Sequence, residues 1–186
     1  MYVKALLVVL MVSVPVSAND LNSDVQRWMI VNDTVMGGRS QANLSLVEGE
    51  GEGEVFRFDG LLSLENNGGF ASIRAVFPRK YFANSEHICI RVRGDGRKYQ
   101  LRLRGGRQLD GIAFAQTFNT EPGKWLNYSF KVSEFVPTFR GRTLRNVRDI
   151  TSEEIRQVTF MIADKSEGEF QLDFTSINPC NPNTTI

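Results

Sequence analysis

Histidine is almost absent from this chain. His87 is the single histidine among 186 residues, and it stands at the start of a predicted strand without a nucleophilic serine or cysteine motif. The two cysteines, Cys89 and Cys180, lack the close spacing of a zinc-binding or redox motif. These shortages argue against a Ser-His-Asp arrangement and against a His/Cys metal set. We therefore expect a protein that is not an enzyme and that uses no metal and no cofactor.

Long hydrophobic runs are also scarce. Lys4 precedes an apolar stretch from Ala5 to Val16, which is too short to span a bilayer comfortably, and no later stretch approaches that length. Val16-Ser17-Ala18 has the small residues of a signal-peptidase site. The sequence predicts a signal peptide over residues 1–18, cleavage near Ala18, and an exported chain, periplasmic or secreted, without a transmembrane segment. The alternative is an uncleaved N-terminal anchor.

A surplus of charge is missing as well. Residues 1–18 contain Lys4 and no acid, so the mature chain has 21 basic and 21 acidic residues. General affinity for nucleic acid or for anionic membranes requires a basic surplus, so we expect no nucleic-acid partner. Residues 19–186 have a length that suits a single domain with its own core.

The two cysteines have two possible states. In an oxidising compartment, Cys89 and Cys180 can form a disulfide that ties the end of the chain to a strand in its middle. The alternative is two free thiols. Sequence separation does not give the distance between the two sulfur atoms, so the sequence leaves both states open.

Beyond the signal peptide, apolar and polar residues alternate with a period of two, which indicates β-strands. Gly- and Asn-rich turns separate these segments, and the only helical signal is Ser152–Arg156, where Ser152 is a candidate N-cap. Many short strands without alternating helices predict an all-β fold, a jelly-roll β-sandwich. The predicted strands are Asn43–Val47, Glu54–Asp59, Phe70–Phe77, His87–Arg93, Lys98–Arg104, Ile112–Phe118, Trp125–Val132, Gln157–Ala163 and Glu169–Ile177.

One hairpin is predicted in detail. If Asp95-Gly96 forms a two-residue turn, Val92 faces Tyr99 and one face of the pair is apolar. The other face then gathers Arg91, Arg93, Arg102 and Arg104. Like charges on one sheet face repel, so this face needs acidic neighbours, solvent or an anionic ligand. We consider it a candidate binding surface, with a solvated face neutralised by a neighbouring strand as the alternative.

Three loop segments are further candidates. Asn32–Ser40 and Asn66–Ser72 each contain paired glycines, and Asp33 can accept hydrogen bonds from backbone amides of its own loop. Phe139–Arg142 adds an aromatic ring and two guanidinium groups. Binding sites are often carried by such loops on a rigid sheet, although simple turn architecture is an equally good explanation.

These segments resemble, in order, the complex I intermediate-associated protein 30 family. The resemblance is carried by Trp28, Val31–Asp33, Val35–Ser40, Asn66–Arg74, Arg93–Gly96, Gly123–Trp125, Phe139–Gly141 and Met161–Lys165. It covers nearly the whole mature chain. It implies a galactose-binding-domain-like sandwich and, for the mitochondrial member, a non-catalytic factor that assembles respiratory NADH:ubiquinone oxidoreductase. The predicted export would separate this chain from the matrix-side arm of that complex.

Three hypotheses follow. The leading one is a non-catalytic binding or assembly protein that holds a protein partner, either a respiratory-complex subunit or another envelope protein. The second is a jelly-roll module for a carbohydrate or another small ligand, with Trp28, Trp125, Phe70 and Phe139 as candidate platforms. The third is an enzyme, which would need two carboxylates in one polar cleft. The candidate binding residues are Asp33, Met36, Gly37, Gly38, Ser40, Asn66, Asn67, Gly68, Gly69, Phe70, Arg74, Arg91, Arg93, Arg102, Arg104 and Arg140.

Overall fold

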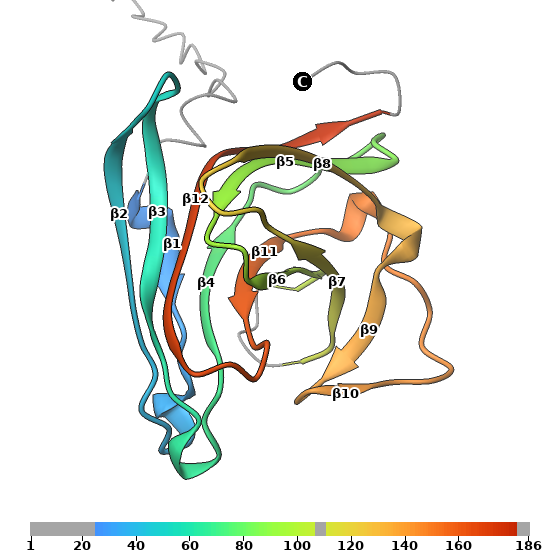
Figure 1. Cartoon of the computed structure of the whole chain (residues 1–186). Coiled ribbons are helices and arrows are strands. Elements are labelled where there is room, and N and C mark those ends of the chain that lie inside the picture. Colours follow the sequence, from blue (N-terminus) through green and yellow to red (C-terminus); the bar gives the residue numbers. More distant parts are fainter. Residues whose placement is uncertain (1–24, 107–110, 182–186) are drawn as a thin grey trace, which may run out of the picture.

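The computed structural model describes residues 25–106 and 111–181. The predicted signal peptide and cleavage site lie outside this range. Within it, the chain is built from strands joined by short 3₁₀ helices (Figure 1). The elements are η1 (Val25–Arg27), β1 (Trp28–Ile30), η2 (Asp33–Met36), β2 (Gln41–Gly49), β3 (Gly53–Leu62), η3 (Glu65–Asn67), β4 (Ala71–Val76), β5 (His87–Gly94), β6 (Lys98–Arg104), β7 (Ala113–Asn119), β8 (Trp125–Lys131), η4 (Val132–Glu134), β9 (Val136–Phe139), β10 (Arg142–Thr143), η5 (Ser152–Glu154), β11 (Gln157–Ile162) and β12 (Gly168–Cys180).

The strands of the described residues form two antiparallel sheets that face each other. One sheet has seven strands in the order β1-β4-β11-β6-β7-β9-β10, and the other has five in the order β2-β3-β12-β5-β8. The seven-stranded sheet curves from β4 through β6 and β7 towards β9 and β10 (Figure 1). Sequence neighbours often lie in different sheets, as expected of a jelly roll. The predicted all-β jelly-roll sandwich is therefore confirmed.

The core lies between the sheets because each strand turns its apolar positions inward. On β11, Val158, Phe160 and Ile162 are fully buried, while the intervening residues point to the outer face. Phe160 contacts Phe174 of the opposite sheet, with 4.8 Å between ring centroids. Trp28 packs 5.1 Å from Phe174 and 6.1 Å from Phe160. Aromatic contacts of this kind join the two sheets and leave one outer face on each.

All nine predicted strands are present, with ends shifted by a few residues at most. The short strands β1, β9 and β10 were not predicted, because each has too few residues to show a period of two. The helical signal near residue 152 corresponds to η5. Its capping box is formed by Thr151 and Glu154 rather than by Ser152.

The predicted hairpin between residues 87 and 104 is wrong. β5 pairs with β12 and β8, whereas β6 lies in the other sheet between β11 and β7. The chain crosses between the sheets at Gly94, where a Cβ atom would lie 2.5 Å from the side chain of Thr120. The carboxylate of Asp95 accepts hydrogen bonds from the Arg97 amide, the Tyr99 hydroxyl and the Gln171 amide. These bonds hold the crossing in place of a two-residue turn.

Cys89 and Cys180 form a disulfide bond. Cys89 lies on β5 and Cys180 is the last residue of β12, and the two strands are hydrogen-bonded neighbours. The hydroxyl of Ser85 also donates a hydrogen bond of 2.7 Å to the Cys180 carbonyl. The end of β12 is therefore anchored both covalently and by hydrogen bonds.

Replacing both cysteines by serine should lower the free energy of unfolding by about 2–4 kcal/mol, because the bridge closes a long loop in the unfolded chain. The sequence separation of 91 residues places the bond among the long-loop cases. Urea unfolding of the oxidised protein and of the double variant measures the difference. Dithiothreitol should destabilise the wild type and leave the double variant unchanged, and equal midpoints without reductant would contradict the expectation.

Candidate binding groove

A wide hollow lies on the outer face of the seven-stranded sheet. It is a groove of about 1540 Å³ that extends from the loops before β2 and β4 to the β9–β10 hairpin. Strands β1, β4, β11 and β6 supply its floor, and the curvature of the sheet brings β9 around to its far side (Figure 1). Its lining residues are Met29, Ile30, Val31, Asn32, Thr34, Val35, Met36, Leu64, Gly68, Gly69, Phe70, Ser72, Arg74, Gln100, Arg102, Arg104, Gly111, Phe139, Arg140, Gly141, Thr159, Met161, Ala163 and Lys165.

A row of polar side chains crosses the floor. Thr159 on β11 pairs with Arg74 on β4 at one side and with Arg102 on β6 at the other. Residues paired in register share a face, so the two arginines stand about 10 Å apart at their Cα atoms with threonine between them. Arg74 and Thr159 are buried, with 7% and 2% of their surface exposed. The floor is therefore cationic and largely shielded from water.

Arg102 lies on β6, at the end of this row. Its two terminal nitrogens donate to the Thr138 hydroxyl at 3.0 Å and to the Met161 sulfur at 3.1 Å. Burial lowers the pKa of Arg102, and the positive charge of Arg74 lowers it further. The guanidinium remains protonated at neutral pH because its ordinary pKa is far higher. A negative charge in the groove would raise this pKa again and so offset both influences.

The rim is apolar and exposed. At one end Val35 and Met36 expose 73% and 66% of their surfaces, and Met29 exposes 47%. At the other end lies Phe139, the last residue of β9 before the β9–β10 turn. The Arg140 guanidinium lies 5.2 Å from the centroid of the Phe139 ring. Arg140 and Gly141 both have positive φ, as a type I′ hairpin turn requires. Exposed apolar side chains around a concave surface are typical of binding sites.

A buried carboxylate fixes the loops at the first end of the groove. Asp33 is fully buried and accepts hydrogen bonds from the amide and hydroxyl of Ser40 in its own loop. It also accepts from the amides of Gly69 and Phe70 in the loop before β4. The two loops, which lie side by side at one end of the sandwich (Figure 1), are held together by this one side chain.

The close approach of Asp33 explains two of the glycines. A Cβ atom at Gly38 would lie 2.4 Å from the Asp33 carboxyl group, and one at Gly68 would lie 2.6 Å from its Oδ2. Burial alone would raise the pKa of Asp33. The hydrogen bonds from Ser40, Gly69 and Phe70 outweigh burial and hold the pKa below its ordinary value. Asp33 is therefore a charged structural anchor beneath the rim.

Arg91 and Arg93 do not lie in the groove, and the prediction of one surface with Arg102 and Arg104 is wrong. They stand on the outer face of the five-stranded sheet. Asp173 of β12, fully buried, accepts from Arg93 and, through both carboxylate oxygens, from Arg57 of β3. Arg91 pairs with Glu52. On this sheet the alternative explanation, a face neutralised by neighbouring acids, is confirmed.

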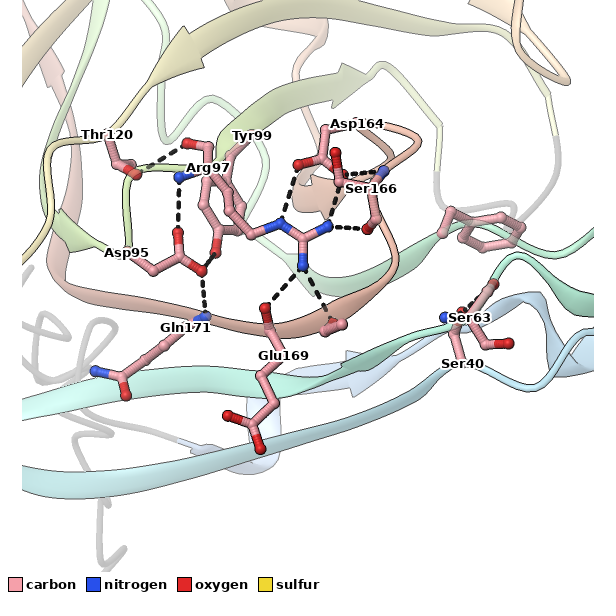
Figure 2. Close-up of polar contacts among 12 residues, drawn as sticks. Ser40, Ser63, Asp95, Arg97, Tyr99, Thr120, Asp164, Ser166, Glu169 and Gln171 are labelled. Atoms are coloured by element: carbon pink, nitrogen blue, oxygen red, sulfur yellow. Dashed lines mark hydrogen bonds and ion pairs between the residues drawn. The ribbon is translucent and has the colours of Figure 1, made fainter.

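Arg97 forms a separate polar cluster on the crossover between the sheets (Figure 2). Its guanidinium is held by both oxygens of Asp164 and by the backbone carbonyls of Ser166, Gly168 and Glu169. Burial would raise the pKa of Asp164, but the hydrogen bonds from Arg97 and the Ser166 amide, together with the charge of Arg97, outweigh burial and lower the pKa. With every terminal nitrogen engaged, this arginine holds the β11–β12 loop against the turn before β6.

The groove therefore contains part of the predicted set. Met36, Gly68, Gly69, Phe70, Arg74, Arg102, Arg104 and Arg140 line it. Asp33 and Ser40 support its rim, and the side-chain amide of Asn66 donates to the Gly37 carbonyl between the two loops. Gly38 and Asn67 lie in those same loops.

Several lining residues were missed by sequence reasoning. Met29, Ile30 and Leu64 are apolar, so their sequence does not distinguish them from core residues, although each is exposed in the groove. Thr159 and Met161 alternate along β11 with the residues that face the core. Assigning the two faces of that strand from its sequence would have identified them as outward-facing.

Of the four aromatic side chains considered as sugar platforms, two line the groove and two do not. The Trp28 ring packs in the core against Phe56, Phe160 and Phe174. Trp125 lies on the five-stranded sheet beneath the guanidinium groups of Arg91 and Arg93. Only Phe70 and Phe139 line the groove, so neither tryptophan offers a platform there.

In residues 25–106 and 111–181, no cluster of three His, Cys, Asp or Glu side chains has the geometry to hold a metal ion. In the same ranges, no helix has the length and hydrophobicity needed to cross a bilayer.

Replacing Asp33 by asparagine should lower the free energy of unfolding by about 1.5–3 kcal/mol at neutral pH, because charge-assisted hydrogen bonds are lost in a buried site. The folded pKa is depressed, so the stabilisation is present above the ordinary value of 3.8 and is lost as the pH falls below it. Urea unfolding at pH 7 and at pH 3 measures the difference. Asp149→Asn, at an exposed position, is the control. A difference that is equal at both pH values would contradict the charged-anchor account.

The comparisons with known proteins agree with this architecture. Over 121 residues, 61% of the chain, it is 28% identical to the probable complex I intermediate-associated protein 30, mitochondrial, of Caenorhabditis elegans. Over 175 residues, 83% of the chain, it is 23% identical to the mitochondrial protein of that name from Mus musculus. The matches span only 36% and 52% of those proteins.

A family 11 carbohydrate-binding module from Clostridium thermocellum, solved in complex with a β-1,3-1,4-mixed-linked tetrasaccharide, has a similar fold. It superposes with a TM-score of 0.63 at 12% identity, over 85% of this chain and 94% of the module. The sequence model for complex I intermediate-associated protein 30 matches residues 18–174. Since that match spans most of the chain, the protein belongs to the complex I intermediate-associated protein 30 (CIA30) family.

Proposed function

We propose that this chain is a non-catalytic assembly factor that holds a protein partner in the groove. The observation that carries the proposal is the exposed apolar rim around a deep hollow on one outer sheet face. Val35, Met36 and Met29 together present flexible apolar surface at one end of it. Such surface is costly in water and is typical of a site that a protein covers.

The methionines support a protein partner rather than a rigid small ligand. Met29, Met36 and Met161 are all the methionines in the described residues, and every one of them lines the groove. The thioether side chain is unbranched and polarizable, so it adapts to partners of irregular shape. A sugar site would instead require flat aromatic platforms, and the tryptophans lie elsewhere.

A binding role also fits the polar groups of the groove. Its described lining includes no carboxylate, histidine or cysteine, the side chains that most often act as general acids, general bases or nucleophiles. The first candidate partner is a subunit of respiratory complex I, because the family and its mitochondrial relatives are named for intermediates of that complex. Another envelope protein is the second candidate.

The partner can be identified by photo-cross-linking in the native host. A benzophenone amino acid at Met36 should capture one protein, expected to be a complex I subunit. The same residue at Leu61 of β3, which is 47% exposed on the other sheet, is the control and should capture nothing at a comparable yield. Mass spectrometry identifies the product. Equal capture from both positions, or no capture from Met36 together with tight binding of the mixed-linked tetrasaccharide, would contradict the proposal.

We also propose that the chain acts outside the cytoplasm, as a single domain of residues 19–186 after removal of the signal peptide. The disulfide between Cys89 and Cys180 supports this location, because such bonds persist in oxidising compartments. A partner would then be met on the outer side of the membrane. Intact-mass analysis of the protein from the host should show a chain that begins at Asn19, whereas a cytoplasmic chain that retains residues 1–18 would refute export.

A further inference from the structure

The described lining of the groove carries charge of one sign. Among its described lining residues five are basic and none is acidic. The outer face of the opposite sheet has acids to neutralise its arginines, as Asp173 and Glu52 show. The described part of this concave surface is therefore positively charged. The five residues are Arg74, Arg102, Arg104, Arg140 and Lys165.

Arg102 is the residue in this set whose contacts are best defined. Within residues 25–106 and 111–181, it touches no carboxylate, and its partners are a hydroxyl group and a sulfur atom. Its Nε is buried and has no hydrogen-bond partner in the same ranges. Leaving a buried donor of a charged group unsatisfied is costly. Arg102 as a whole is half-buried and lines the groove, so an incoming oxyanion would pair with its guanidinium charge and would offset the positive charge of Arg74.

We propose that the groove recognises an extended acidic segment of a protein, with a carboxylate of that segment paired to Arg102 and neighbouring apolar side chains packed on the rim. The inference rests on the proposed function, since it names the chemistry of the partner held in the same groove. Arg74 and Arg104 flank the subsite. Arg102 and Arg104 alternate along β6, so their Cα atoms are about 6.6 Å apart, and carboxylates at alternate positions of an extended segment have the same spacing.

The rim favours a protein segment over other anions. Inorganic phosphate would use the guanidinium groups and leave Met29, Val35 and Met36 exposed. An acidic oligosaccharide would need aromatic surfaces for its rings, and the described groove offers Phe70 and Phe139 only, the latter already covered by Arg140. A segment that combines carboxylates with leucine- or methionine-like side chains complements both the floor and the rim.

The test uses two synthetic peptides with blocked termini. One has glutamates at two alternate positions flanked by leucines, and the other has glutamines in their place. Calorimetric titration of the full mature protein should show the glutamate peptide binding at least about ten-fold more tightly, as expected for charge-assisted pairing. Arg102→Gln should abolish this preference and Arg102→Lys should reduce it. Arg145→Gln removes a charge at an exposed position outside the groove and should leave the preference intact.

The outcomes separate this inference from the proposed function. Equal affinity for the two peptides, no measurable binding of either, or a preference that survives in a folded Arg102→Gln variant overturns the acidic-segment proposal. If cross-linking at Met36 still captures a protein, the groove remains a protein-binding site, but the segment it binds is not acidic. If oligogalacturonate or inorganic phosphate binds more tightly than the glutamate peptide and loses affinity in Arg102→Gln, the occupant is another anion. Circular dichroism melting of each variant checks that it is folded.

Discussion

The need to compensate shielded charge governs both outer faces of this sandwich. On the five-stranded sheet, Asp173 is fully buried and is tolerated because Arg57 and Arg93 surround it. Burial would raise its pKa, but the hydrogen bonds from the two arginines outweigh burial and lower it. On the seven-stranded sheet, Arg102 is shielded beside a second arginine and meets a hydroxyl group and a sulfur atom instead. The arginines of one face are paired with acids of the same chain, and we propose that those of the other face are paired with acids of a partner.

The need to compensate a buried charge also fixes the shape of the groove, through Asp33. A carboxylate buried below the rim can remain ionised only if donors surround it, and the donors come from two loops far apart in sequence. The requirement that Gly38 and Gly68 lack side chains follows from how closely this carboxylate approaches them. The loops therefore present Val35 and Met36 from a fixed base, which reduces the entropy lost on binding.

The sequence was sufficient for the fold class because period-two alternation survives in nearly every strand. The same alternation could not show which strands pair. Ile90, Val92 and Leu101 face the core whether β5 and β6 form a hairpin or cross between two sheets, since both arrangements bury the same positions. The crossing is held by contacts such as that of Asp95 with the Gln171 amide, which joins residues far apart in sequence and leaves no local pattern. For that reason Arg102 was identified as a candidate but placed with the wrong neighbours.

The loops were predicted more successfully than the floor. The Asp33 and Asn66–Phe70 segments were recognised because glycine and asparagine pairs mark demanding turns. Thr159 and Met161 were not, because an outward residue on a strand looks the same whether the face is flat or hollow. Shared architecture with a carbohydrate-binding module fixes the fold, whereas the side chains on the floor and rim decide what can bind.

Oxidative footprinting of the protein bound to its partner tests the central claim most directly. Met29, Met36 and Met161 all line the groove, whereas Trp125 lies on the opposite sheet. One experiment therefore measures the protection of both outer faces. Occupancy of the groove predicts that hydroxyl-radical oxidation of the three methionines falls on complex formation while that of Trp125 is unchanged. Unchanged methionine oxidation with protection of Trp125 would place the binding surface on the other sheet and contradict the account.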